Sequence, residues 1–119
     1  MLKSQQYKIV ISGGGSGIGA ALAEELSSEG HSVMICGRRV SKLQKIVENN
    51  NNVTYFPCDI SNEKDVLEFV SDVSKDHDCV DVLINCAGLF GAIGRFDQTD
   101  STEWKETIDI NLFGTYLLA

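Results

Sequence analysis

Hydrophobic residues along this chain follow two alternating patterns: short continuous apolar runs, and longer segments with helical spacing. Continuous runs bounded by polar residues or glycine are typical of strands buried on both faces of a parallel sheet. They predict strands over residues 7–12, 32–37, 53–57 and 80–85. Between the runs, apolar residues recur every three or four positions. This spacing predicts helices over residues 17–29, 40–49 and 61–76 (capped by Ser61 or Asn62), and a last helix from Ser101 or Thr102.

The helical spacing also predicts which side chains face the core. Gly30 supplies the stop signal of the first helix. In the first helix Ile18, Leu22 and Leu26 recur at helical spacing, and Ile18 is also a candidate cofactor-binding residue. One face of the second helix carries Leu43, Ile46 and Val47. The residues of the third helix expected to face inward are Val66, Phe69, Val70 and Val73. In the last helix an apolar stripe with i, i+4 spacing, Trp104, Ile108, Leu112 and Tyr116, predicts a face that includes Asn111 as a buried amide.

Strands that alternate with helices indicate an α/β fold with a parallel sheet. Right-handed crossovers predict the strand order 3-2-1-4, the first four strands of a Rossmann-type doubly wound sheet. We therefore expect residues 1–119 to form a single incomplete domain that ends inside a helix. The fourth strand would then be an apolar sheet edge, which predicts self-association of the isolated chain. The ligand crevice is expected where the strand order reverses, at the carboxyl ends of strands one and four.

A glycine-rich loop between the first strand and the first helix is the strongest functional signal. It reads Ser12-Gly13-Gly14-Gly15-Ser16-Gly17-Ile18-Gly19. Such a loop directs backbone N–H groups and the positive end of the helix dipole at an anion, which favours the pyrophosphate of a dinucleotide. The alternative is a tight packing turn without a ligand. If the loop binds pyrophosphate, a side chain at Gly13 or Gly17 should block binding at a modest cost in stability.

The ends of the other strands carry further candidate residues. Arg38 and Arg39 follow the second strand, and the next carboxylate is Glu48. A dinucleotide fold that prefers NAD places Asp or Glu here, whereas arginine pairs with a 2′-phosphate, so NADP is favoured over NAD. The alternative is a solvated arginine pair at the start of a surface helix.

Asp59 and Ile60 follow the third strand, where a carboxylate could accept a hydrogen bond from adenine and the isoleucine could pack on the ring. Asp59 could equally well only stabilise the turn. Asn85, Ala87 and Gly88 follow the fourth strand, where small residues would admit the nicotinamide ribose. Asn85 could also simply tie two backbones together.

Composition excludes several other classes of function. The chain has a net charge of −7, which argues against nucleic acid or an anionic membrane as its main partner. It contains no apolar stretch of membrane-spanning length and no secretory leader, so a cytoplasmic protein is expected. The four cysteines have no zinc-site spacing, and we expect them to be reduced, mostly buried thiols and predict no metal.

These motifs together resemble the short-chain dehydrogenase/reductase family over residues 7–119. The similarity is carried by the glycine-rich loop, Arg38, Asp59-Ile60, Asn85-Cys86-Ala87-Gly88 and Ile110-Asn111-Leu112-Phe113-Gly114, in that order. The resemblance implies hydride transfer between NAD(P)(H) and a carbonyl or alcohol. It also implies that Arg38 selects NADP, and that Asn111 is the asparagine of the Asn-Ser-Tyr-Lys catalytic set. Ser12 in place of threonine and Cys86 in place of a second asparagine are mild departures.

One departure from the family is large, because the acid–base Tyr-x-x-x-Lys does not occur. The tyrosines, at positions 7, 55 and 116, have no lysine four residues later. A reductase needs a positioned proton donor. We therefore expect the cofactor-binding half of an oxidoreductase that is inactive alone and pairs with a second copy or with the missing half. The alternatives are a non-catalytic nucleotide-binding or regulatory protein, and a methyltransferase, which would need an acidic residue in place of Arg38. A P-loop enzyme is excluded because Gly-Lys-Ser/Thr is absent. The sequence does not identify the substrate.

Overall fold

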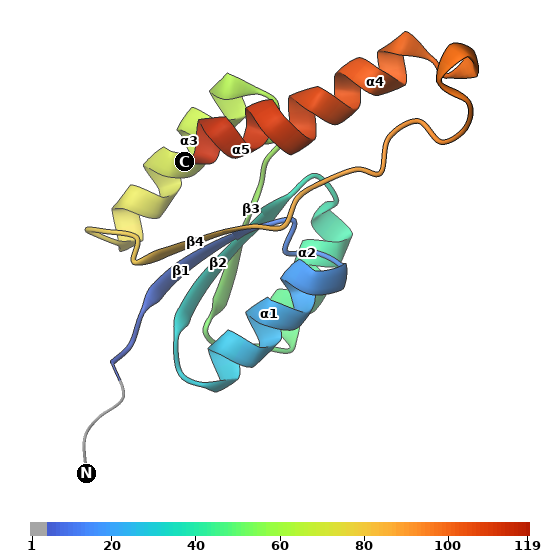
Figure 1. Ribbon diagram of the computed structural model, residues 1–119. Coiled ribbons are helices and arrows are strands. Elements are labelled where there is room, and N and C mark those ends of the chain that lie inside the picture. The colour runs from blue at the N-terminus through green and yellow to red at the C-terminus, as the bar shows by residue number, and fades with distance from the viewer. Residues whose placement is uncertain (1–4) are drawn as a thin grey trace.

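The computed structural model describes residues 5–119 (Figure 1). Its four strands form one parallel sheet in the order β3-β2-β1-β4, which confirms the α/β class and the predicted topology. The strands are β1 (Lys8–Ser12), β2 (Ser32–Gly37), β3 (Val53–Pro57) and β4 (Val82–Asn85). Thus β1 begins one residue, and β4 two residues, later than predicted.

Helices cover both faces of the sheet, with α1 and α2 on one face and α3 and α5 on the other (Figure 1). Glycine and asparagine cap the ends as expected: Gly30, with φ +94°, follows α1, and the Asn62 side chain accepts a hydrogen bond from the N–H of Asp65 at the start of α3. The helical segments are α1 (Gly17–Ser28), α2 (Val40–Glu48), α3 (Glu63–Asp76), α4 (Ser101–Ile108), the π-helical segment η2 (Asp109–Gly114) and α5 (Thr115–Leu118), with a 3₁₀ turn η1 (Phe96–Gln98) before α4.

Alternate residues of the central strands supply the two halves of the core. Ile9 and Ile11 of β1 pack beneath α1 and α2 together with Ala23 and Leu43. Val10 lies on the other face, in a cluster that includes Met34, Phe69 and Ile110. A strand that is apolar on both faces is what a sheet covered on both sides requires. The core therefore fixes the carboxyl ends of the strands where the candidate residues lie.

Two apolar residues that fit the helical spacing are exposed. Ile18 is 75% exposed, because it lies in the first turn of α1, beyond the end of the sheet. Val70 on α3, which was expected to face inward, is half exposed, while its neighbours Val66, Phe69 and Val73 are buried. Helical spacing thus marks a wider apolar stripe than the one that the sheet covers.

The last helix presents a different face from the one predicted. The stripe of Trp104, Ile108, Leu112 and Tyr116 is 43–71% exposed, whereas Ile110 and Gly114 are buried. The reason is a close approach at Gly114, where a Cβ would lie 2.6 Å from Cγ1 of Ile60. Only glycine permits this contact. The predicted continuous helix is also interrupted by the π-helical segment η2.

Strand β4 lies at the edge of the sheet, as predicted, because it pairs only with β1. Its cover is partial, and Val82 is 37% exposed. Ile108 and Leu112 of the last helical segment are exposed, whereas Leu117 packs partly buried against the core. Within residues 5–119, no helix has the length and apolar character needed to cross a membrane.

Candidate functional site

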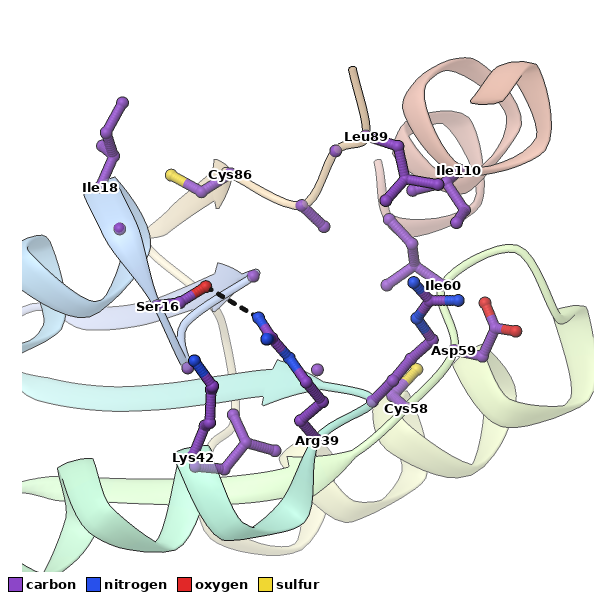
Figure 2. Close-up of a pocket in the computed structure, with 18 of the residues that line it drawn as sticks. Ser16, Ile18, Arg39, Lys42, Cys58, Asp59, Ile60, Cys86, Leu89 and Ile110 are labelled. Atoms are coloured by element: carbon purple, nitrogen blue, oxygen red, sulfur yellow. Dashed lines mark hydrogen bonds between the residues drawn. The ribbon is translucent and has the colours of Figure 1, made fainter. Parts of the chain in front are cut away.

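A pocket of about 860 Å³ lies at the carboxyl ends of the strands, where the sequence predicts the ligand crevice (Figure 2). It brings together eleven of the fifteen predicted site residues. These are Gly13, Gly15, Ser16, Gly17, Ile18, Arg38, Arg39, Asp59, Ile60, Ala87 and Gly88. Residues from three separate strand ends and from the start of α1 therefore line one space. Ser12, Gly19, Asn85 and Asn111 lie outside its lining.

Gly13 allows the glycine-rich loop to contact the end of β4. Its φ is +68°, and a Cβ there would lie 2.6 Å from the backbone nitrogen of Ala87. Its N–H donates to the carbonyl of Cys36 at 2.9 Å. Gly13 is therefore a packing glycine, and the expectation that Gly13→Ala costs only modest stability is wrong, because the backbone atoms of Cys86 and Ala87, directly after β4, cannot move aside as a flexible side chain can.

Gly17 differs from Gly13, because it opens onto free space. Its φ is +55°, no atom lies within 4 Å of a built Cβ, and it is the first residue of α1. Gly19 is again a packing glycine, whose Cβ would collide with the carbonyl of Gly13. The loop thus uses glycine for two separate reasons, close packing and access to the pocket.

The amino terminus of α1 is open for an anion. The N-cap residue Ser16 makes no side-chain capping bond, and the first turn contains no acidic residue. The first N–H groups of a helix have no partner within the helix, and the helix dipole adds positive potential there. Because Gly15, Ser16, Gly17 and Ile18 line the pocket, these donors face it. This end of the pocket fits a phosphate group.

Three cationic side chains line the pocket beside this terminus: Arg38, Arg39 and Lys42. The guanidinium of Arg39 donates from Nη2 to Oγ of Ser16 at 3.2 Å (Figure 2). Arg38 pairs with Glu106 of α4, Nη1 to Oε1 at 3.7 Å. Sequence reasoning missed Lys42, although its place in the first turn of a helix that begins directly after Arg39 was a usable signal.

Asp59 stabilises its turn, as the alternative interpretation predicts. Its Oδ1 accepts hydrogen bonds from the N–H of Ser61 at 3.0 Å and from its hydroxyl at 2.6 Å. Within the described chain its Oδ2 has no hydrogen-bond partner, so one carboxylate oxygen remains available in the pocket wall. Ile60 lines the pocket and is 5% exposed, since most of its side chain packs against Gly114 and the core. Asp59 can therefore both stabilise the turn and offer a hydrogen-bond acceptor to a ligand in the pocket.

Two polar residues at the strand ends lie outside the pocket lining. Ser12 is fully buried, and its Oγ accepts a hydrogen bond from the N–H of Ala87 at 3.3 Å. Asn85 is in register with Ser12 on the edge strand and is exposed. Ser12 therefore joins the glycine-rich loop to the end of β4, and Asn85 precedes the segment that lines the pocket.

The Asn111 side chain holds the loop that follows β4. Its Nδ2 donates to the carbonyl of Leu89, and its Oδ1 accepts from the N–H of Leu89, both at 2.8 Å. Asn111 lies in the π-helical segment η2, a rare conformation that is frequent at functional sites. The amide finds partners as predicted, but Asn111 is exposed and not buried. Gly88 lies against it, since a Cβ there would be 3.2 Å from Oδ1.

All four cysteines are free, and Cys58, which lines the pocket, lies beside buried Cys36. The Cys36 thiol donates a hydrogen bond to Cys58, and this bond together with burial raises the pKa of Cys36. The same bond lowers the pKa of Cys58, against the opposite effect of burial. Burial raises the pKa of Cys86. Cys79 is exposed, so the expectation of buried thiols fails there. No cluster of three or more metal-ligating side chains occurs in residues 5–119.

Sequence reasoning also missed much of the apolar wall. Cys58, Leu89, Phe90 and Ile110 line the pocket but carry no polar group that would attract attention in a sequence. Ile110 had a usable signal in its position beside Asn111. Figure 2 shows Leu89 and Ile110 together on the side of the pocket away from the α1 terminus.

Comparison with known proteins agrees with this arrangement. The chain is similar to an uncharacterised oxidoreductase of Staphylococcus aureus (strain USA300), 33% identical over 112 residues that cover 92% of this chain and 48% of the relative. It thus spans about half the length of the curated relatives it matches.

Two similar solved structures contain a nicotinamide cofactor. The 3-ketoacyl-(acyl-carrier-protein) reductase of Brucella melitensis complexed with NADH superposes with a TM-score of 0.90 at 26% identity, over 97% of this chain and 48% of that one. A variant of actinorhodin polyketide ketoreductase with NADPH gives a TM-score of 0.87 at 26% identity, over 94% of this chain and 44% of that one. The family model for short chain dehydrogenases matches residues 7–119. With this match, the fold and the pocket, the chain belongs to the short-chain dehydrogenase/reductase family.

Proposed function

We propose that this chain binds NADP(H) and is the cofactor-binding part of an oxidoreductase that transfers hydride between nicotinamide and a carbonyl or alcohol. One observation carries the proposal: an open helix amino terminus and three cationic side chains line the same pocket. Phosphate groups are recognised by this combination of backbone N–H donors and guanidinium groups. Membership of the family and neighbours that contain NADPH or NADH support a nicotinamide cofactor.

We assign each part of the cofactor to a separate part of the pocket. The N–H groups of Ser16 to Ile18 would hold the pyrophosphate, and Arg38 would pair with the 2′-phosphate. Adenine would lie between Asp59 and Ile60, and Ala87 with Gly88 would approach the nicotinamide ribose. The fit rests on donors and cations that the pocket directs inward. Asn85 stays a candidate at the edge of the site.

The cations after β2 favour NADP over NAD. NAD-selective folds place a carboxylate at this position to bond the ribose hydroxyls, whereas Arg38, Arg39 and Lys42 occupy the pocket here. A dianionic 2′-phosphate is matched by positive charge, and a planar guanidinium can bond it through two N–H groups. NAD remains the weaker ligand in this proposal.

Asn111 is proposed as a catalytic residue of the complete enzyme, by the resemblance alone. Its side chain here is occupied by Leu89, so what it does in this chain is to fix the loop beside the nicotinamide end of the pocket. A proton donor for the substrate oxygen is needed as well, and no Tyr-x-x-x-Lys occurs in the sequence. We therefore propose that these 119 residues bind cofactor but do not turn over substrate alone.

The missing acid–base pair is also the observation that favours a second function, a non-catalytic nucleotide-binding or regulatory protein. The two functions differ when a segment with Tyr-x-x-x-Lys, as in longer family members, is joined to the chain: only the first predicts that carbonyl reduction appears. A cytoplasmic location, a small-molecule substrate, and pairing with a second copy or with a carboxyl-terminal half complete the proposal.

Cofactor titration tests the proposed function. Arg38→Ala should weaken the binding of NADPH by about ten- to a hundredfold, since a hydrogen bond to a charged group contributes about 1.5–3 kcal/mol. The affinity for NADH should stay nearly unchanged. Arg95→Ala is the matched control, because Arg95 also pairs with a carboxylate, Asp97, but does not line the pocket. Equal affinities of the wild-type chain for NADPH and NADH would contradict the NADP assignment.

A further inference from the structure

An ion pair joins Arg38, which lines the pocket, to helix α4. Nη1 of Arg38, directly after β2, lies 3.7 Å from Oε1 of Glu106 on α4. Glu106 does not itself line the pocket, but it lies one helical turn before Ile110, which does. The two side chains are 50% and 53% exposed. The guanidinium of Arg38 therefore already has an anionic partner on a separate helix.

The other cations of the pocket lack such a partner. Arg39 bonds the neutral hydroxyl of Ser16. Neither Arg39 nor Lys42 forms an ion pair within residues 5–119. Of the three cations that line the pocket, only Arg38, the residue that would receive the 2′-phosphate, is thus paired with a negative charge.

We propose that Glu106 is a specificity-determining residue that limits the preference for NADPH over NADH by competing with the 2′-phosphate for Arg38. The inference rests on the proposed function, because it needs a 2′-phosphate at Arg38. NADH has no charge at that position and does not meet the competitor. A carboxylate about 6 Å from a phosphate of nearly two negative charges weakens its binding by roughly three- to tenfold at low salt.

The opposite role, in which Glu106 orients Arg38 for the phosphate, is disfavoured by the geometry. A carboxylate that holds a guanidinium in place does so through two short parallel hydrogen bonds. Here a single contact of 3.7 Å joins two half-exposed side chains. Such pairs are weak and do not fix a rotamer. The negative charge of Glu106 should therefore affect the affinity for a 2′-phosphate more than its contact with Arg38 does.

The test compares Glu106→Gln with Glu103→Gln. Both variants keep the shape of the side chain and remove one negative charge from α4, but Glu103 forms no ion pair within the described chain. Dissociation constants are measured for adenosine 2′,5′-bisphosphate, 5′-AMP, NADPH and NADH at low and high salt. In Glu106→Gln the two ligands with a 2′-phosphate should bind roughly three- to tenfold more tightly, while 5′-AMP and NADH stay within about twofold. Glu103→Gln should leave all four ligands within about twofold, and high salt should reduce the gain.

Failure of this inference and failure of the proposed function give different results. If wild type prefers the 2′-phosphate ligands and Arg38→Ala abolishes the preference, but Glu106→Gln matches Glu103→Gln, only the role of Glu106 is overturned. Weaker NADPH binding in Glu106→Gln, or equal gains for NADPH and NADH, also overturns it. If wild type binds 5′-AMP as tightly as adenosine 2′,5′-bisphosphate, or binds no nucleotide, the proposed function fails first, and this inference fails with it.

Discussion

Replacing Gly17 by alanine separates cofactor binding from folding better than any other change in the loop. Gly17 has φ +55°, and a Cβ would meet no protein atom within 4 Å. The only cost to the folded chain is the left-handed backbone, about 1–2 kcal/mol for a residue with a Cβ. For a domain of this size, that lowers Tm by roughly 4–10 °C. The added methyl group enters the space beside the N–H donors of α1, so NADPH binding should fall below detection.

Gly30→Ala is the matched control, at the other end of the same helix. Gly30 also has positive φ, +94°, and open space around a built Cβ, but it lies outside the pocket lining. Urea unfolding should show similar losses for both variants, while a cofactor titration should show normal binding only for Gly30→Ala. Gly13→Ala should lose more stability than either, because of its contact with Ala87. Normal NADPH affinity in folded Gly17→Ala would refute the phosphate role of this loop.

Three further outcomes are expected. The 119-residue chain should reduce no carbonyl of a broad panel with NADPH, and a rate above background would reveal an unseen proton donor. In a protein extended by a Tyr-x-x-x-Lys segment, Asn111→Ala should lower kcat more than cofactor affinity. Light scattering at micromolar concentration should show self-association, because Val82 on the edge strand is partly uncovered; a monomer that melts cooperatively would contradict this. Iodoacetamide should label exposed Cys79 first and buried Cys36 last, and mass spectrometry that found the reverse order would contradict the burial shown here. The labelling rate of Cys86 should continue to rise with pH above the ordinary thiol pKa range, because burial raises the pKa of Cys86.

The sheet and the position of the pocket could be predicted because local signals agree there. Continuous apolar runs marked each strand, and glycine or charged residues marked each carboxyl end. The crossover rule then places these ends together. For the same reason several polar residues that line the pocket could be named from the sequence. Arg38 directly follows β2, Asp59 lies two residues after β3, and parallel strands end at one edge of the sheet.

The parts that could not be predicted depend on contacts between distant segments. The buried face of the last helix is decided by the approach of Gly114 to Ile60, which the apolar stripe ending at Tyr116 contradicts. The packing role of Gly13 depends on Ala87, far away in the sequence. The ion pair of Arg38 with Glu106 is likewise visible only once α4 is docked. Periodicity describes one helix or strand at a time and holds no information about such pairs.

The double hydrogen bond between Asn111 and Leu89 also provides a natural reporter of motion. Within residues 5–119, the N–H of Leu89 donates to Oδ1 of Asn111 and to no other acceptor, so its amide proton can exchange with solvent whenever η2 moves away. The exchange rate of this single proton therefore measures how often the wall formed by α4, η2 and α5 opens. A bound nucleotide that contacts both sides of the pocket should slow that exchange, even though it touches neither of the two atoms in the bond.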